Sequence, residues 1–68
     1  MNEIIFLIEE SLEGGYVARA LETSIHTEAD NLTELKDSIR EAIKCHYNEN
    51  ERPRIIRLHF VKEEVITL

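Results

Sequence analysis

The sequence predicts an α+β domain in which one helix covers one face of a single four-stranded sheet. The prediction depends on three observations. Segment 31–47 (NLTELKDSIREAIKCHY) has the apolar spacing of an amphipathic helix, while the segments on either side have the apolar runs and the alternation of β-strands. The chain has 68 residues, which leaves room for one small domain, 1–68. The expected element order is β-β-β-α-β.

The first strand is predicted over Glu3–Ile8 (EIIFLI), an apolar run typical of a strand at the centre of a sheet. Alternate residues from Ile4 to Ile8 are expected to face the helix. Ile5 and Leu7 then face the other way, and they also need cover. This second apolar face is a first indication of a second chain.

A glycine pair next predicts a β-hairpin. Gly14 and Gly15 allow positive φ and can close a turn between the first strand and a returning strand over Tyr16–Leu21. A third strand is predicted over Ser24–Ala29. Its outer face is polar, which is typical of a strand at the edge of a sheet.

The helix over 31–47 follows the three strands. Asn31 can cap its first turn through the side-chain oxygen, and Glu34 can reach back to complete a capping box. Two i,i+3 ion pairs are expected on its exposed face, Asp37 with Arg40 and Glu41 with Lys44. The apolar stripe that faces the sheet consists of Leu32, Leu35, Ile39, Ala42 and Ile43.

The last strand is predicted over Arg54–Val61, after a polar stop that ends in Pro53. Its residues Ile56, Leu58 and Phe60 are expected to face the core. A right-handed crossover through the helix sets this strand parallel beside the first and gives the sheet order 3-2-1-4. A long apolar strand then lies at an open edge, which natural proteins usually protect.

The open edge, the second face of the first strand and the apolar residues after the last strand together predict a homodimer or larger assembly. Either a second chain or the chain's own C-terminal segment is expected to cover the edge. The residues expected to mediate self-association are Ile5, Leu7, Ile55, Arg57, His59, Val61, Val65 and Ile66.

The composition of the chain limits the kinds of partner and the cellular compartment that we expect. The net charge of −6 argues against direct binding of nucleic-acid phosphates and favours a basic protein partner. Cys45 is the only cysteine, which suits a reducing compartment. No apolar run reaches the length of a membrane span, and no basic n-region of a secretory signal precedes the first apolar run. We therefore expect a cytoplasmic protein that does not bind membranes.

No constellation of residues predicts catalysis, a metal site or a cofactor. His26, His46 and His59 lie on separate predicted elements and lack the spacing of metal ligands. Cys45 and His46 are helical neighbours whose side chains point about 100° apart, so Cys45 is expected to pack beside the apolar stripe. The topology is similar to a truncated ribonuclease-H-like sheet, but the central strand carries no carboxylate for the divalent cations of that chemistry.

Two segments resemble the N-terminal domain of HicB-like antitoxins. Residues 13–18 (EGGYVA) match the family's Gly-Gly-Tyr-Val-Ala hairpin, and residues 29–35 (ADNLTEL) match its small residue, Asp, cap and helix start. The resemblance covers roughly residues 3–47. Two departures exist: the short connection 21–24 replaces an Asp-Leu-Pro-Gly turn, and no match to the family's DNA-binding segment follows residue 47. The chain is thus similar to a compact, single-domain branch of the group.

The resemblance implies a non-enzymatic role, the neutralisation of a small basic ribonuclease toxin of the double-stranded-RNA-binding type, without operator binding. Acids beside the matched hairpin and helix start are expected to guide such a partner, namely Glu9, Glu10, Glu13, Glu28 and Asp30. The alternative is a structural or self-assembly domain that binds itself or an unrelated protein and has no toxin partner.

Overall fold

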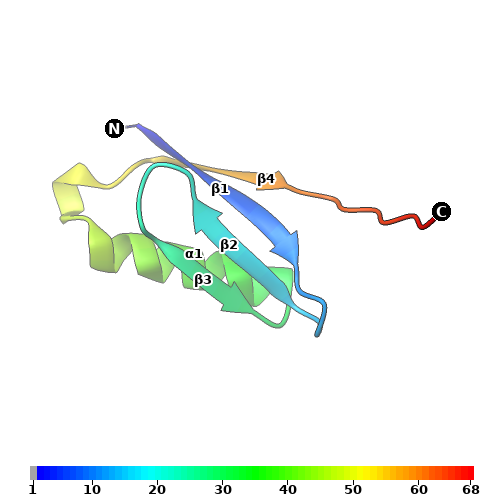
Figure 1. The fold of residues 1–68 in the computed structure, drawn as a ribbon. Helices are drawn as coiled ribbons and strands as arrows, with labels where there is room; N and C mark the ends of the chain where they lie inside the picture. The colour runs from blue at the N-terminus through cyan, green and yellow to red at the C-terminus, as the bar shows by residue number, and fades with distance from the viewer. Residues whose placement is uncertain (1) are drawn as a thin grey trace.

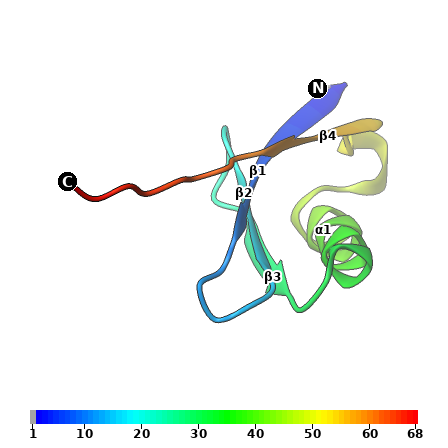
Figure 2. The same ribbon diagram turned by 90° about the vertical axis from the view of Figure 1, so that its right-hand side faces the viewer.

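The computed structural model describes residues 2–68, which form one sheet, one α-helix and a short 3₁₀ turn (Figure 1). The helix lies on one face of the sheet only, and the other face is open (Figure 2). The elements are β1 (Glu3–Glu10), β2 (Tyr16–Ala20), β3 (His26–Ala29), α1 (Leu32–His46), the 3₁₀ turn η1 (Glu49–Glu51) and β4 (Ile55–Phe60).

The strand order is β3-β2-β1-β4, as the sequence predicts. β1 pairs antiparallel with β2, and β2 pairs antiparallel with β3. β4 lies parallel to β1, with Glu3 opposite Ile55 and Ile8 opposite Phe60. The crossover through α1 makes this parallel pairing possible and leaves β3 and β4 as the two edges.

The strand ends differ from the predicted ones in several places. β1 continues two residues beyond Ile8, because Glu9 and Glu10 still pair with the returning strand. β3 begins at His26 instead of Ser24, because Thr23 Oγ1 accepts the N–H of Ile25 at 3.2 Å and holds this region in a turn. β2 ends at Ala20, and β4 is one residue shorter at each end than predicted.

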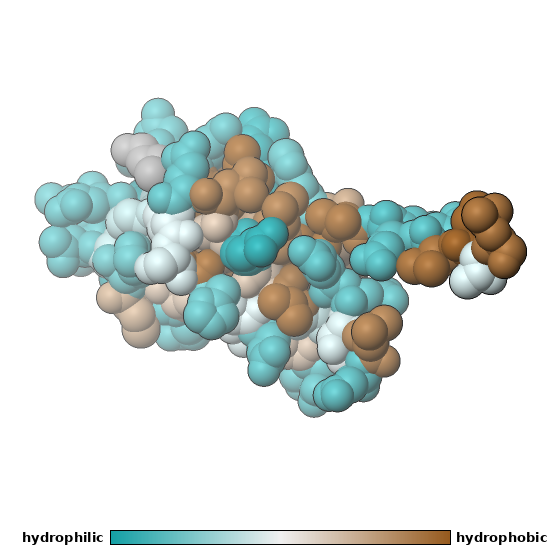
Figure 3. All heavy atoms as spheres, in the orientation of Figure 1, coloured by the Kyte–Doolittle hydropathy of each residue, from teal (hydrophilic) through white to brown (hydrophobic). Residues whose placement is uncertain are grey.

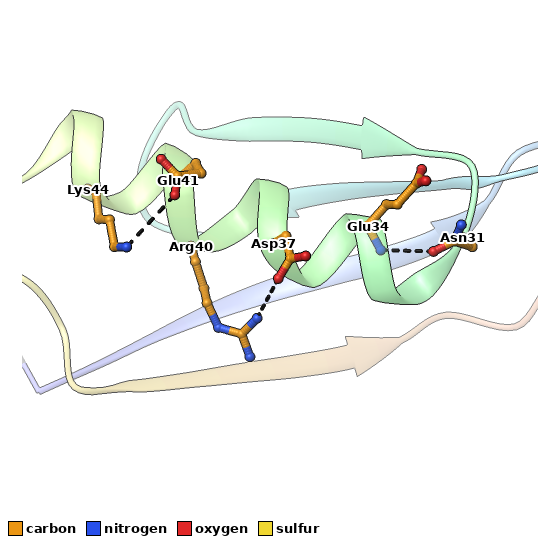
Figure 4. Close-up of polar contacts among 6 residues, drawn as sticks. All are labelled: Asn31, Glu34, Asp37, Arg40, Glu41 and Lys44. Atoms are coloured by element: carbon orange, nitrogen blue, oxygen red, sulfur yellow. Dashed lines mark hydrogen bonds and ion pairs between the residues drawn. The ribbon is translucent and has the colours of Figure 1, made fainter.

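The ends of α1 lie where the capping residues indicate. Asn31 is the N-cap, and its Oδ1 accepts the backbone N–H of Glu34 at 2.8 Å (Figure 4). The structure shows this half of the predicted capping box. Tyr47 is the C-cap. Figure 4 also shows both expected i,i+3 ion pairs, Asp37 with Arg40 at 3.0 Å and Glu41 with Lys44 at 3.8 Å.

The core lies between α1 and the facing side of the sheet. The apolar stripe of the helix meets the alternate residues of β1 and β2, so the face assignment made from the sequence is confirmed. The buried apolar side chains are Ile4, Phe6, Ile8, Ala18, Ala20, Ile25, Leu35, Ile39 and Ile43.

The helix does not cover the whole sheet equally. α1 packs along β2 and β3, which leaves β4 at the thinly covered side. Ile56 and Leu58 are half-buried against the core, but Phe60 is 57% exposed. The expectation that Phe60 faces a closed core is therefore wrong, because β4 carries this residue past the cover that the helix provides.

Candidate functional site

The two segments that carry the hairpin and the helix start meet at one end of the sheet. Gly14 and Gly15 have φ of +95° and +84°, in the left-handed region that glycine adopts without strain. A Cβ on Gly15 would lie 2.6 Å from the carbonyl oxygen of Ala29, whereas a Cβ on Gly14 would meet nothing within 4 Å. The turn thus lies directly against the end of β3, beside the residues that lead into α1.

This junction forms a polar hollow of about 520 Å³ with an acidic rim. Four acids line it: Glu13 from the turn, Glu28 from β3, Asp30 from the connection and Glu34 from the first turn of α1. Among the described residues that line the hollow there is no lysine or arginine. We call Glu13, Glu28, Asp30 and Glu34 the acidic rim.

The acids of the rim have no arginine or lysine partner, unlike four other acids of the described chain. Within residues 2–68, Glu3, Glu9, Asp37 and Glu41 each lie within 4.0 Å of an arginine or lysine. The four acids of the rim have no such ion pair in the described chain. Asp30 and Glu34 lie at the N-terminal end of α1, where negative charge is favourable, and the charge of all four acids can attract a basic group.

The structure separates the five acids that the sequence groups together. Glu13, Glu28 and Asp30 belong to the acidic rim. Glu9 and Glu10 line a second hollow of about 680 Å³, which lies between the end of β1 and the segment after β4. Glu9 also lies 4.0 Å from Arg19, so part of its charge is already compensated.

The open face of the sheet carries most of the residues expected to mediate self-association. Ile5 and Leu7 lie there half-buried, beside Arg57 and His59 of β4. Arg57 Nε donates to Glu3 Oε2 at 2.8 Å on the same face. Ile55 and Val61 are about half exposed, while Val65 and Ile66 project with the segment after β4. Figure 3 looks onto this face and shows apolar patches separated by polar side chains.

The three histidines lie on three different elements of the structure. His26 is on β3, His46 ends α1 and His59 is on β4. No group of three or more His, Cys, Asp or Glu within residues 2–68 has the arrangement of a metal site. Cys45 is exposed, so the prediction that it packs beside the apolar stripe is wrong; the helix turns it away from the sheet. Over the same residues, no helix has the length and apolar character needed to span a bilayer.

Sequence reasoning missed one acid of the rim and its aromatic neighbour. Glu34 appears in the sequence as a capping residue, yet it also lines the hollow; its place three positions after the N-cap is the signal that could have located it beside Asp30. Tyr16 also lines both hollows and is half-buried. Its position directly after the glycine pair could have indicated this.

Two relatives show the family of this chain. A UPF0150 protein of Archaeoglobus fulgidus is 50% identical over 55 residues, which cover 81% of this chain and 82% of the relative. A UPF0150 protein of Thermotoga maritima is 38% identical over 67 residues, which cover 98% of this chain and 94% of the relative. The chain belongs to the UPF0150 family. No family model and no solved structure matches the sequence. The likeness to the UPF0150 protein of Thermotoga maritima spans the sheet, the helix and β4, so the whole fold described above lies within the similar region.

Proposed function

We propose that this UPF0150 protein is a non-enzymatic binding protein that acts as a stand-alone HicB-like antitoxin and neutralises a small basic ribonuclease toxin. Three features support the proposal. The hairpin and helix start resemble those of HicB-like antitoxins, the chain carries a net charge of −6, and four acids without an ion pair meet at one hollow.

The acidic rim is the observation that carries the proposal. The matched hairpin supplies Glu13, and the matched helix start supplies Asp30 and Glu34, so the two segments of the resemblance build one surface. Lysine and arginine side chains of a basic protein can reach into a hollow of about 520 Å³ and bind such carboxylates. The rim needs no metal and no nucleophile for this role, which is capture of a partner.

Coexpression with any small basic protein that is encoded beside this chain's gene tests the proposal. We expect the two proteins to copurify and the growth arrest caused by the basic protein to be suppressed. The paired variant Glu13→Lys/Glu28→Lys should then slow association at least about tenfold at low salt and flatten its dependence on ionic strength, because charges near an interface act mainly on the encounter rate. Its melting temperature should change little, since both side chains are exposed.

A matched control separates this effect from the change in net charge. Glu22 and Glu49 are exposed acids outside the hollow, so Glu22→Lys/Glu49→Lys changes the net charge equally. We expect this control to associate nearly as fast as the unchanged protein. Equal slowing by both paired variants would assign the effect to net charge alone, and absence of any copurifying basic protein would remove the antitoxin proposal.

A further inference from the structure

The largest uncovered apolar region of the described chain is β4 together with the residues that follow it. Residues 61–68, here called the C-terminal segment, continue from β4 and project away from the sheet on the side opposite α1 (Figures 1 and 2). Apolar side chains gather at its far end (Figure 3). The exposed large apolar side chains in this region are Ile55, Phe60, Val61, Val65, Ile66 and Leu68.

The edge of β4 also carries backbone groups without a strand to pair with. Ile55 donates its N–H to the Asn2 carbonyl at 3.0 Å, and Val61 donates to the Ile8 carbonyl at 2.9 Å. Backbone groups alternate in direction along a strand, so the odd-numbered residues bond to β1. The groups that point away from the sheet therefore belong to Ile56, Leu58 and Phe60, and no strand of residues 2–68 lies beside them.

The chain's own C-terminal segment does not suit this edge. To pair with β4 of the same copy it must reverse direction directly after Phe60. The residues available for such a turn are Val61, Lys62, Glu63 and Glu64, which include no Gly, Pro, Asn or Asp. The segment instead keeps the direction of β4, which makes the strand longer and offers it to another copy (Figure 1).

We propose that two copies of this chain pair antiparallel along β4 and the C-terminal segment, with Phe60 of one copy opposite Phe60 of the other. A twofold axis at Phe60 makes the arrangement closed and reciprocal. Residues 55–65 of each copy then form one strand, and the two sheets become continuous. On the open face the opposed pairs are Ile55 with Val65, Arg57 with Glu63 and His59 with Val61, each joining two copies.

The pairing of opposite charges and the burial of apolar side chains favour this register over the neighbouring registers. It places Arg57 opposite a glutamate of the other copy. Arg57 Nε can keep its bond to Glu3, and the remaining guanidinium donors can bind that glutamate. This register also covers Phe60 with the same side chain of the second copy. A register centred on Leu58 instead sets Arg57 opposite His59 and leaves the C-terminal segment uncovered.

Stacking of two open faces is a poorer arrangement for the same copies. The open face carries the ion pairs Glu9–Arg19 at 4.0 Å and Glu3–Arg57 at 2.8 Å. Stacking would remove water from both pairs, and the cost of desolvating charged groups opposes it. Pairing along the edge leaves these groups at a solvated face and uses backbone groups that otherwise have only water as a partner.

Sedimentation equilibrium on two variants of exposed residues tests whether β4 and the C-terminal segment form the dimer interface. We expect the unchanged chain to reach twice its mass of 8.0 kDa at tens of micromolar. Val65→Asp should weaken dimerisation at least tenfold, whereas Leu21→Asp, an equal change on the open face away from β4, should leave it unchanged. A monomer throughout, or a loss caused by Leu21→Asp and not by Val65→Asp, would overturn the proposal. Circular dichroism checks that both variants keep the fold.

Two neighbouring charge reversals test the register. Glu63→Lys sets a lysine opposite Arg57 of the second copy and should weaken dimerisation at least tenfold. Glu64→Lys makes the same change in net charge, but its side chain points to the other face, opposite Ile56, and should have little effect. Equal effects of the two reversals would contradict the register. This test needs no toxin partner, so its outcome is independent of the antitoxin proposal.

Discussion

At the scale of single residues, the two glycines of the β1–β2 turn have different structural roles. Both have positive φ, which an L-residue adopts only with strain. Gly15 in addition touches the backbone of β3, because a Cβ there would overlap the Ala29 carbonyl oxygen. Gly14 is needed for the shape of the turn alone, and Gly15 is needed also for the contact between the turn and β3.

Alanine at each glycine should therefore have unequal effects on stability. Gly14→Ala should lower the free energy of unfolding by about 1 kcal/mol, the cost of a left-handed conformation. Gly15→Ala should cost more, because the added Cβ would lie 2.6 Å from the Ala29 carbonyl oxygen and one of the two must move. Urea denaturation of both variants measures the difference. Equal losses would mean that the turn and β3 do not approach as closely as the structure shows.

These residues also show what sequence can and cannot predict. The glycine pair predicts a hairpin because positive φ is a local requirement. The contact of Gly15 with Ala29 depends on the register of β2 against β3, in which Tyr16 lies opposite Ala29, and nothing local to residues 14–15 specifies it. The acidic rim is similar: Glu13 and Asp30 were expected to bind a partner, but their convergence with Glu34 follows from the packing of the turn against α1.

At the scale of elements, the bounds of α1 are well predicted, whereas the ends of the strands and the cover of β4 are not. The bounds of α1 follow from Asn31 and from the apolar stripe, both of which act within a few residues. The strand ends depend on which residues of the neighbouring strand are available for pairing. β1 therefore continues through Glu9 and Glu10, which pair with β2 despite their charge. The exposure of Phe60 depends on where α1 lies across the sheet. The alternation of apolar residues in β4 does not predict that position.

The buried residues of α1 should carry most of its packing energy. Leu35 is fully buried against the sheet, so Leu35→Ala should lower the free energy of unfolding by roughly 2–5 kcal/mol. Leu32, which is only half-buried at the first turn, provides the comparison, and Leu32→Ala should cost clearly less. Thermal melts and urea titrations of both variants measure the losses. Similar losses would contradict the placement of Leu35 at the centre of the core.

At the scale of the whole molecule, one layer of helix on one sheet leaves half of the sheet surface in contact with water. A chain of 68 residues buries a small fraction of its surface, so association would add to its stability. Pairing along β4, if it stabilises the folded state, must link the melting temperature to the chain concentration, because the dimer then competes with unfolded monomers.

We therefore expect the melting temperature to rise by several degrees when the chain concentration is raised about a hundredfold. Val65→Asp should remove most of this rise, since it disrupts the proposed pairing while the core residues stay unchanged. Differential scanning calorimetry at several concentrations measures the effect. A melting temperature that stays constant in the unchanged protein would show that association contributes nothing to its stability.

The parallel pairing of β1 with β4 also has a consequence during folding. The meander and α1 lie within residues 3–46 and need no residue of β4, so β1 is an edge strand until β4 docks. Because β4 pairs across the whole helix crossover, we expect its docking to be slower than closure of the hairpin. In that interval β4 of a neighbouring chain fits the same edge of β1. Refolding at high chain concentration should therefore favour strand-exchanged products over separately folded chains.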